Sequence, residues 1–384
     1  MQTAVASLTA ALLLTLTACS AQPAPAPAAR PPAEPAAPAT APAAPAPAAP
    51  ATPSSPASPA APAAVPPLSP PVAVKVGGLG IAAEAGIYIA MGKGYFRDEG
   101  LDVEFIQFGR GAEQMPALAT GELHFGSGAP DPSHFNAVAR GIDVKIVGIN
   151  DLVNQDYNAT YLVVRQDLLD SGRYKELRDL KGLNLAVSGT GTVATIYLER
   201  ILARGGLSLD DVTFTNIFFP DMMAALANKA VDAAWLTEPF LNAAESQGLG
   251  QRTIGMNDVY RGLITQALLL SPVFAREQPE AARRFVTAHL RGQRDYYRAM
   301  IRQDGSRDEV LQILSKHTSI KDPAENARMG THGVSLNGEI DEQVLSDMQD
   351  YYIRYGTQQQ KVDVAQVVDH SYLDYALQRL GPFQ

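Results

Sequence analysis

Three hydroxyl side chains and two glycines stand together in the segment Ser188 to Thr192 (SGTGT). The segment joins a predicted strand, residues 183–187, to a predicted helix, residues 192–204, so the free N–H groups of a helix start lie beside the hydroxyls. Together these groups can bind a carboxylate, sulfonate or phosphate. The alternative is that Ser and Thr only cap the helix, and no Arg or Lys stands beside the loop in the sequence. The sequence predicts a ligand-binding loop formed by Ser188, Gly189, Thr190 and Thr192.

Further polar and aromatic side chains follow other predicted strands. Ligands of open α/β sheets bind beyond the carboxyl ends of the strands, which extends the candidate site to Gly80, Ile81, Glu84, Ser127, Gly128, Asp131, Asn158, Phe219 and Glu238. Asp131 and Glu238 each precede a proline at a predicted helix start, where an acidic residue also serves as a cap or favours the helix dipole. Tyr157 and Phe218 can stack on an aromatic ligand or merely pack, and we expect Trp235 to belong to the core.

Composition and missing motifs exclude several classes of protein. The formal net charge of -9 provides no basic face for nucleic acid. The histidines have no zinc-site spacing, and neither a Gly-Lys-Ser/Thr phosphate loop nor a Gly-x-Ser-x-Gly elbow occurs. The only cysteine, Cys19, stands outside the predicted folded part, which therefore has no cysteine nucleophile, ligand or disulfide. We expect no cofactor, no metal, no nucleic-acid partner and no enzymatic activity.

Short strands and helices alternate from Val72 onward, which is typical of parallel sheets flanked by helices. The same alternation begins again at Leu183, so the sequence predicts two α/β units. Two apolar stretches, residues 161–164 and 264–270, are expected to cross between them. We therefore expect a first lobe over 72–164, a second lobe over 165–263, and a return to the first lobe over 264–384 with a helical C-terminal part.

Three motifs resemble a known group of proteins. They are the run Gly94 to Val103 (GYFRDEGLDV), the run Ala117 to Glu122 (ALATGE) and the run Trp235 to Pro239 (WLTEP). They are similar to signatures of the ABC-importer binding proteins for nitrate, sulfonate and taurine and of their relatives for thiamine-pyrimidine precursors. The resemblance covers residues 74–272, with a looser fit beyond.

The resemblance implies a type 2 periplasmic binding protein fold, with two α/β lobes that close on a solute by hinge motion. It implies a transmembrane permease as partner, and we expect the chain to act as a monomer. Sulfonate, nitrate, a pyrimidine and an aromatic or organic acid all remain open as ligands. Two alternatives are a sensory or accessory binding lipoprotein without a permease and an enzyme like the thiamine-pyrimidine synthase.

The N-terminal region predicts export and a lipid anchor. Residues 1–18 are predicted to be a signal peptide. Their apolar stretch, Ala10 to Leu16, is too short to span a bilayer and is placed like the core of a signal peptide. The following segment, Leu16 to Cys19 (LTAC), resembles the lipobox of bacterial lipoproteins, in which the cysteine is lipidated. Residues 20–71 hold nineteen of the 28 prolines and only two charges, which predicts a disordered tether. We expect the protein on the periplasmic side of a bacterial membrane or on the cell surface.

Overall fold

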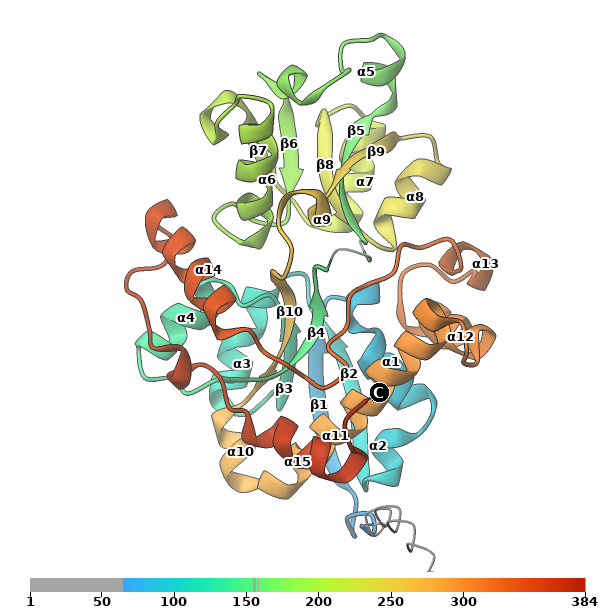
Figure 1. Ribbon diagram of the computed structural model, residues 1–384, viewed down its shortest axis with the longest axis vertical. Coiled ribbons are helices and arrows are strands. Elements are labelled where there is room, and N and C mark those ends of the chain that lie inside the picture. The colour runs from blue at the N-terminus through green and yellow to red at the C-terminus, as the bar shows by residue number, and fades with distance from the viewer. Residues whose placement is uncertain (1–64, 155–156, 158, 384) are drawn as a thin grey trace, which may run out of the picture. The chain divides into compact units, whose positions relative to one another are not determined.

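The computed structural model describes residues 65–154, 157 and 159–383, and these residues form two α/β lobes (Figure 1). The predicted signal peptide, Cys19, the tether up to residue 64 and the candidate Asn158 lie outside the described residues. Within the described part of the chain, no helix is long and apolar enough to cross a membrane. That part also contains no group of three or more His, Cys, Asp or Glu side chains arranged to hold a metal ion.

Lobe 1 is built on a five-stranded sheet with the order β2-β1-β3-β10-β4. Four strands run in one direction, and β10 runs antiparallel to both of its neighbours. The strands are β1 (Val72–Gly78), β2 (Leu101–Gln107), β3 (Phe125–Gly128), β4 (Lys145–Leu152) and β10 (Ile264–Leu270). All seven residues of β10 are buried, as its mostly apolar sequence and its place between two other strands require.

Lobe 2 repeats this plan with the strand order β7-β6-β8-β5-β9. Here β5 is the strand that runs antiparallel to its two neighbours. The strands are β5 (Thr160–Arg165), β6 (Asn184–Val187), β7 (Thr213–Asn216), β8 (Ala233–Thr237) and β9 (Gly250–Gly255). In each lobe the antiparallel strand is the first one after the chain arrives from the other lobe (Figure 1).

The predicted fold class is confirmed, but the two crossing stretches are placed differently. Residues 161–164 belong to β5, which pairs with β8 and β9, so lobe 1 ends before Thr160 rather than at residue 164. Residues 264–270 form β10 inside the sheet of lobe 1. The chain crosses just before β5 and just before β10. A central strand and a segment that crosses between lobes are both short and apolar. The sequence pattern therefore does not distinguish them, which explains why the crossing points were predicted at the wrong residues.

Helices cover the sheets of both lobes and build the C-terminal part of lobe 1 (Figure 1). In lobe 1 and its C-terminal part they are α1 (Ala85–Gly92), α2 (Tyr95–Asp98), α3 (Met115–Thr120), α4 (Pro132–Ala139), α10 (Pro272–Glu277), α11 (Pro279–Tyr296), α12 (Arg307–His317), α13 (Pro323–Asn326), α14 (Glu342–Tyr355) and α15 (Ser371–Leu380). In lobe 2 they are α5 (Gln166–Asp170), α6 (Val193–Arg204), α7 (Phe219–Ala227), α8 (Phe240–Ser246) and α9 (Met256–Val259). Short 3-10 helices stand at Ala82–Glu84, Gly111–Gln114, Leu177–Leu180, Leu209–Asp211 and Val364–Gln366, and a π-helical turn, Tyr297–Arg302, follows α11.

The GYFRDEGLDV segment ties α2 to α11 and turns the chain into β2. Phe96 is buried and stacks on Phe285 with ring centroids 4.6 Å apart. The Tyr95 hydroxyl donates to Asp295, which also accepts from Lys93 at 2.8 Å. Gly100 has a φ of +75°, a value that favours glycine, and Leu101 then enters the core. The segment therefore anchors α2 to α11 and leads the chain into the core of lobe 1.

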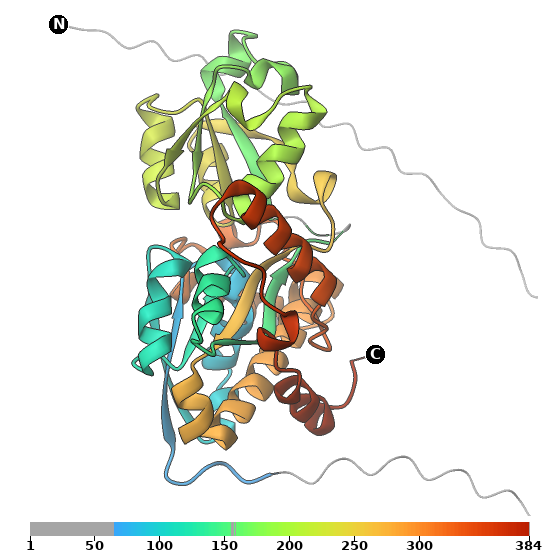
Figure 2. The same ribbon diagram turned by 90° about the vertical axis from the view of Figure 1, so that its left-hand side faces the viewer.

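The segment after α14 joins the two lobes beside their sheets (Figure 2, red). The Thr357 hydroxyl donates to the carbonyl of Gly191 in lobe 2 at 3.0 Å. In lobe 1, the Asn136 side chain donates to the Thr357 carbonyl at 2.9 Å. An exposed ion pair, Arg354 with Glu199 at 2.7 Å, spans the same junction. The C-terminal part therefore holds lobe 2 as well as lobe 1.

Candidate functional site

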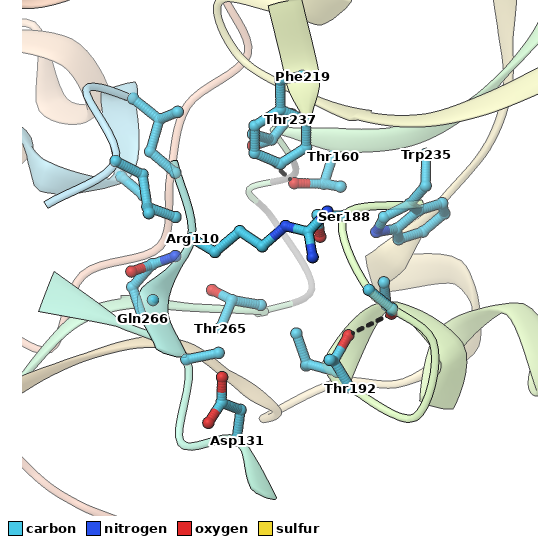
Figure 3. A pocket seen from close by; sticks show the side chains of 18 of the residues that line it. Arg110, Asp131, Thr160, Ser188, Thr192, Phe219, Trp235, Thr237, Thr265 and Gln266 are labelled. Carbon is cyan, nitrogen blue, oxygen red and sulfur yellow. Dashed lines mark hydrogen bonds between the residues drawn. The ribbon is translucent and has the colours of Figure 1, made fainter. Parts of the chain in front are cut away.

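A cavity of about 420 Å³ lies between the two lobes, at the carboxyl ends of several strands (Figure 3). This is the expected location for a ligand in sheets of this type. Lobe 1 contributes Leu79, Ile81, Ala83, Arg110, Gly111, Ala112, Ala129, Asp131, Asp151, Thr265 and Gln266. Lobe 2 contributes Thr160, Ser188, Gly189, Thr190, Thr192, Val193, Ala194, Asn216, Phe218, Phe219, Trp235, Thr237 and Met256.

The loop between β6 and α6 lines the cavity with all four of its predicted residues. Asn216 accepts a hydrogen bond from the Thr190 N–H at 2.8 Å and so fixes the loop to the end of β7. Thr192 is the N-terminal flanking residue of α6, but its hydroxyl donates to the Gly189 carbonyl at 2.8 Å and makes no capping hydrogen bond. The side chains of this loop thus do not cap α6, and the first N–H groups of that helix remain available to a ligand.

Arg110 brings to the cavity the positive charge that the loop Ser188 to Thr192 lacks in its own sequence. It stands after β2, directly before the 3-10 helix Gly111–Gln114, and its side chain extends across the cavity toward Ser188 of lobe 2 (Figure 3). Among the described residues, its guanidinium has no ion pair and no hydrogen-bond partner. A free guanidinium opposite hydroxyls and helix N–H groups is suited to an anionic group.

Asp131 both caps a helix and lines the cavity. Its Oδ1 accepts from the N–H of Ser133 at 2.9 Å, from the N–H of His134 at 3.3 Å and from the Ser133 hydroxyl at 2.5 Å. Burial raises the pKa of this carboxyl, although the hydrogen bonds act in the opposite direction. The capping alternative is therefore confirmed, and the carboxyl group also belongs to the cavity wall.

Asp151 lies in the cavity wall with a protein group close to each of its carboxylate oxygens. Its Oδ2 accepts from the Thr265 hydroxyl, and its Oδ1 lies 3.1 Å from Nδ1 of His332. Both Asp151 and His332 are buried. This carboxylate is therefore less available to a ligand than Asp131 is.

Apolar side chains from both lobes complete the cavity wall. Phe219 is the first residue of α7 and stacks on Phe240 at 5.6 Å between ring centroids. Trp235 stacks on Tyr197 at 5.6 Å and is only 4% exposed, so the core placement predicted for it is confirmed. Trp235 nevertheless lines the cavity too, and on the lobe 1 side the wall includes Leu79 and Ile81. The cavity thus has a polar part and an apolar part.

Glu84 does not line the cavity, and neither does Gly80. The Glu84 carboxylate is fully buried and accepts from the N–H groups of Leu79 at 2.6 Å, Gly80 at 2.9 Å and Ile81 at 3.1 Å, and from the Tyr88 hydroxyl at 2.7 Å. Burial raises its pKa against the effect of these hydrogen bonds. Glu84 therefore holds the loop that presents Leu79 and Ile81, because four donors saturate it before a ligand arrives.

Ser127 and Gly128 are also absent from the cavity wall. The Ser127 hydroxyl accepts from the Asn150 amide at 2.7 Å and lies 3.4 Å from Oε1 of Gln266, to which it donates. Gln114 donates to the Ser127 carbonyl at 2.9 Å. Ser127 thus supports Gln266, which does line the cavity, while Ser127 and Gly128 themselves do not line it in this conformation.

Glu238 binds two parts of the chain rather than facing the cavity. Its carboxylate accepts from the N–H of Asn242 in α8 at 3.1 Å and from the N–H of Gly330 in the C-terminal part at 2.9 Å. It is fully buried, and burial raises its pKa. The contact with α8 agrees with the structural alternative, and the contact with Gly330 was not predicted. Tyr157 is likewise absent from the cavity wall.

Comparisons with known proteins agree with this architecture. The model of the family described as NMT1/THI5 like matches residues 82–299. A putative aliphatic sulfonates-binding protein of Bacillus subtilis is 28% identical over 303 residues, which are 76% of this chain and 85% of that protein.

Solved structures show the same fold at low sequence identity. The periplasmic nitrate-binding protein NrtA from Synechocystis PCC 6803 aligns with a TM-score of 0.67 at 16% identity, over 81% of this chain and 89% of its own. The alkanesulfonate-binding protein SsuA from Xanthomonas axonopodis pv. citri, bound to MOPS, aligns with a TM-score of 0.61 at 20% identity, over 79% and 100%. The desulfurization enzyme DSZB also has this fold, with a TM-score of 0.57 at 16% identity, over 80% and 99%.

Proposed function

Because the chain belongs to the NMT1/THI5 like family, we propose that it is an extracytoplasmic solute-binding protein that captures a small organic anion between its lobes. It then delivers the solute to the permease of an ABC importer. The relatives named for sulfonates support this assignment, and the chain acts as a monomer in this scheme.

The observation that carries the proposal is the placement of Arg110 opposite the loop Ser188 to Thr192. The unpaired guanidinium comes from lobe 1 and the loop from lobe 2, so an anionic group bound between them contacts both lobes. Such a ligand stabilises the arrangement in which the lobes are close together. The apolar residues Ile81, Phe219 and Trp235 favour a sulfonate or carboxylate with an organic part over a bare inorganic ion.

Thermal unfolding with a panel of solutes tests the function. Alkanesulfonates, aminoalkanesulfonates and aromatic carboxylates are compared with nitrate and with a pyrimidine, each added well above the protein concentration. A ligand present at 100 times its Kd stabilises the folded state by about 2.7 kcal/mol, and we expect organic acids to raise Tm in this way. A Tm unchanged by every solute in the panel contradicts the proposal.

The same proposal places the protein outside the cytoplasm, held by lipid on Cys19 after removal of residues 1–18. The resemblance of the LTAC segment to a lipobox supports this step. In cells, the wild-type protein is expected in the membrane fraction and the Cys19→Ala variant in the soluble extracytoplasmic fraction. Equal distribution of the two proteins argues against the anchor.

The enzymatic alternative rests on fold alone, since DSZB is an enzyme with this fold at 16% identity. The only cysteine of this chain is Cys19, which precedes the folded part, and no Cys, His or Lys stands among the described residues that line the cavity. Incubation with a bound sulfonate, followed by an assay for released sulfite, separates an enzyme from a binding protein. A sensory lipoprotein differs in that it does not bind a permease, which co-purification tests.

A further inference from the structure

Two opposite charges face the cavity without pairing with each other. Arg110 and Asp131 both line it, but they form no ion pair, and both side chains are described. Oppositely charged groups in one partly enclosed site attract each other. Their separation indicates that each is placed to meet a different group of the ligand.

One oxygen of Asp131 is available to a ligand. The three hydrogen bonds that Asp131 accepts from Ser133 and His134 all end on Oδ1. Oδ2 accepts no hydrogen bond from any described residue, and it lies 4.0 Å from the position that a Cβ atom on Gly111 would occupy. Gly111 follows Arg110 and is itself part of the cavity wall, so Oδ2 is on the cavity side of the carboxyl group.

The other carboxylate of the cavity does not offer the same acceptor. Asp151 accepts from Thr265 and lies beside His332, so neither of its oxygens is without a neighbouring protein group. A partly buried carboxylate oxygen that loses water without gaining a donor costs about 1–3 kcal/mol or more. Asp131 therefore favours ligands that bring a donor and disfavours ligands that do not.

We propose that Asp131 determines specificity, with its Oδ2 accepting a hydrogen bond from an ammonium or hydroxyl group of the solute while Arg110 binds the acidic group. The ligand class is then a small organic acid that also carries an N–H or O–H donor, such as an aminoalkanesulfonate. This inference rests on the proposed function, since it assumes that a solute occupies this cavity.

Matched ligands and an isosteric variant test the proposal by calorimetry. Wild-type protein is titrated with 3-aminopropanesulfonate and with propanesulfonate, which differ only in the amino group. We expect the amino compound to bind at least tenfold more tightly. Asp131→Asn exchanges the free oxygen for an NH2 group, and we expect it to bring the two affinities within about twofold while binding of propanesulfonate stays the same or improves.

The Asn substitution is chosen because Asn caps helices about as well as Asp, so α4 keeps its cap. Asp341→Asn is the control, because Asp341 caps α14 through the same two positions, Gln343 and Val344, and its side chain is exposed outside the cavity. This variant is expected to keep the wild-type preference. Equal binding of both ligands by the wild type overturns the role of Asp131 but supports the binding function.

Two further outcomes are decisive. If Asp131→Asn weakens binding of both ligands equally, the residue has only a structural role and the proposal is wrong. If wild-type protein binds neither these sulfonates nor any other acid of the panel, the proposed function fails first, and the inference fails with it.

Discussion

Arg110 and Ser188 line the same cavity from different lobes, and in the proposed complex one anion contacts both. A charge-assisted hydrogen bond contributes about 1.5–3 kcal/mol, and a tenfold change in Kd corresponds to about 1.4 kcal/mol. An anionic group of the ligand gives up its bound water when it enters the cavity. If its charged partner has been removed, it gains no hydrogen bond in return. Arg110 is therefore the side chain whose removal we expect to reduce the affinity for an anion most.

We expect Arg110→Ala to weaken binding of an organic anion about ten- to a hundredfold. The stability of the protein without ligand should change little, because no described residue pairs with this guanidinium. Titration calorimetry measures the affinity. The control is Arg97→Ala, which removes an exposed arginine of the same lobe outside the cavity; equal effects of the two substitutions argue against a specific contact.

Residue patterns predicted the lobe 2 side of the site better than the lobe 1 side. The loop from Ser188 to Thr192 is continuous in sequence, so its hydroxyls and glycines could be read together. Arg110 stands far from that loop along the chain, and only the fold brings the two together. Its signal was an arginine between two glycines after a predicted strand. Glu84 and Glu238 do not line the cavity, because backbone N–H groups already donate to their carboxylates, and a sequence does not show such contacts.

At the scale of elements, the segment after α14 connects the loop Ser188 to Thr192 of lobe 2 to lobe 1. Gly191 lies so close to it that a Cβ atom there would come within 2.2 Å of the Thr357 Cγ2, and its φ of +71° also favours glycine. The hydroxyl of Thr357 donates to the Gly191 carbonyl. The position of the loop Ser188 to Thr192 therefore depends on the segment after α14, which contributes no side chain to the cavity wall.

Thr357→Val keeps the shape of the side chain and removes only that hydroxyl. A net loss of about 0.5–1.5 kcal/mol for one hydrogen bond predicts affinity reduced about two- to tenfold, measured by the same calorimetry. Thr357→Ser retains the hydroxyl and should restore most of the affinity. If valine and serine give the same Kd, the hydrogen bond does not position the loop.

Secondary-structure elements could be predicted where the sequence of a single segment determines them. The alternation of strands and helices and the turn at Gly100 follow from local patterns. The membership of β5 in lobe 2 does not, because its apolar residues would suit either sheet and only its pairing with β8 and β9 decides. The hydrogen bond between Thr357 and Gly191 was not predictable either, because no local sequence pattern connects the two residues.

At the scale of the whole molecule, two buried histidines link stability to pH. Burial lowers the pKa of His289 to about 3 and that of His134 to about 4, against an ordinary value of 6.5. His134 is held by a 2.8 Å hydrogen bond between Nε2 and the Val144 carbonyl. As the pH falls below 6.5, the unfolded chain takes up protons at these residues while the folded protein does not. Stability is therefore present above 6.5 and is lost between about 6.5 and 3.

We expect each of these histidines to add a slope of about 1.4 kcal/mol per pH unit within that window. Urea unfolding between pH 7.5 and 5 measures the slope in wild-type protein and in His289→Gln. The variant should be less stable at pH 7.5 but should lose less stability on acidification. His370→Gln, which changes an exposed histidine, should follow the wild-type slope, and parallel curves for His289→Gln and wild type contradict the prediction.

The chain contains a single tryptophan, Trp235, and that side chain lines the same cavity as the loop Ser188 to Thr192. Its indole stacks on Tyr197 and is almost completely shielded from solvent. A molecule that enters the cavity changes the surroundings of this indole and of no other. Tryptophan fluorescence of the unlabelled protein, excited at a wavelength where the 14 tyrosines absorb little, should therefore report occupancy through a single indole.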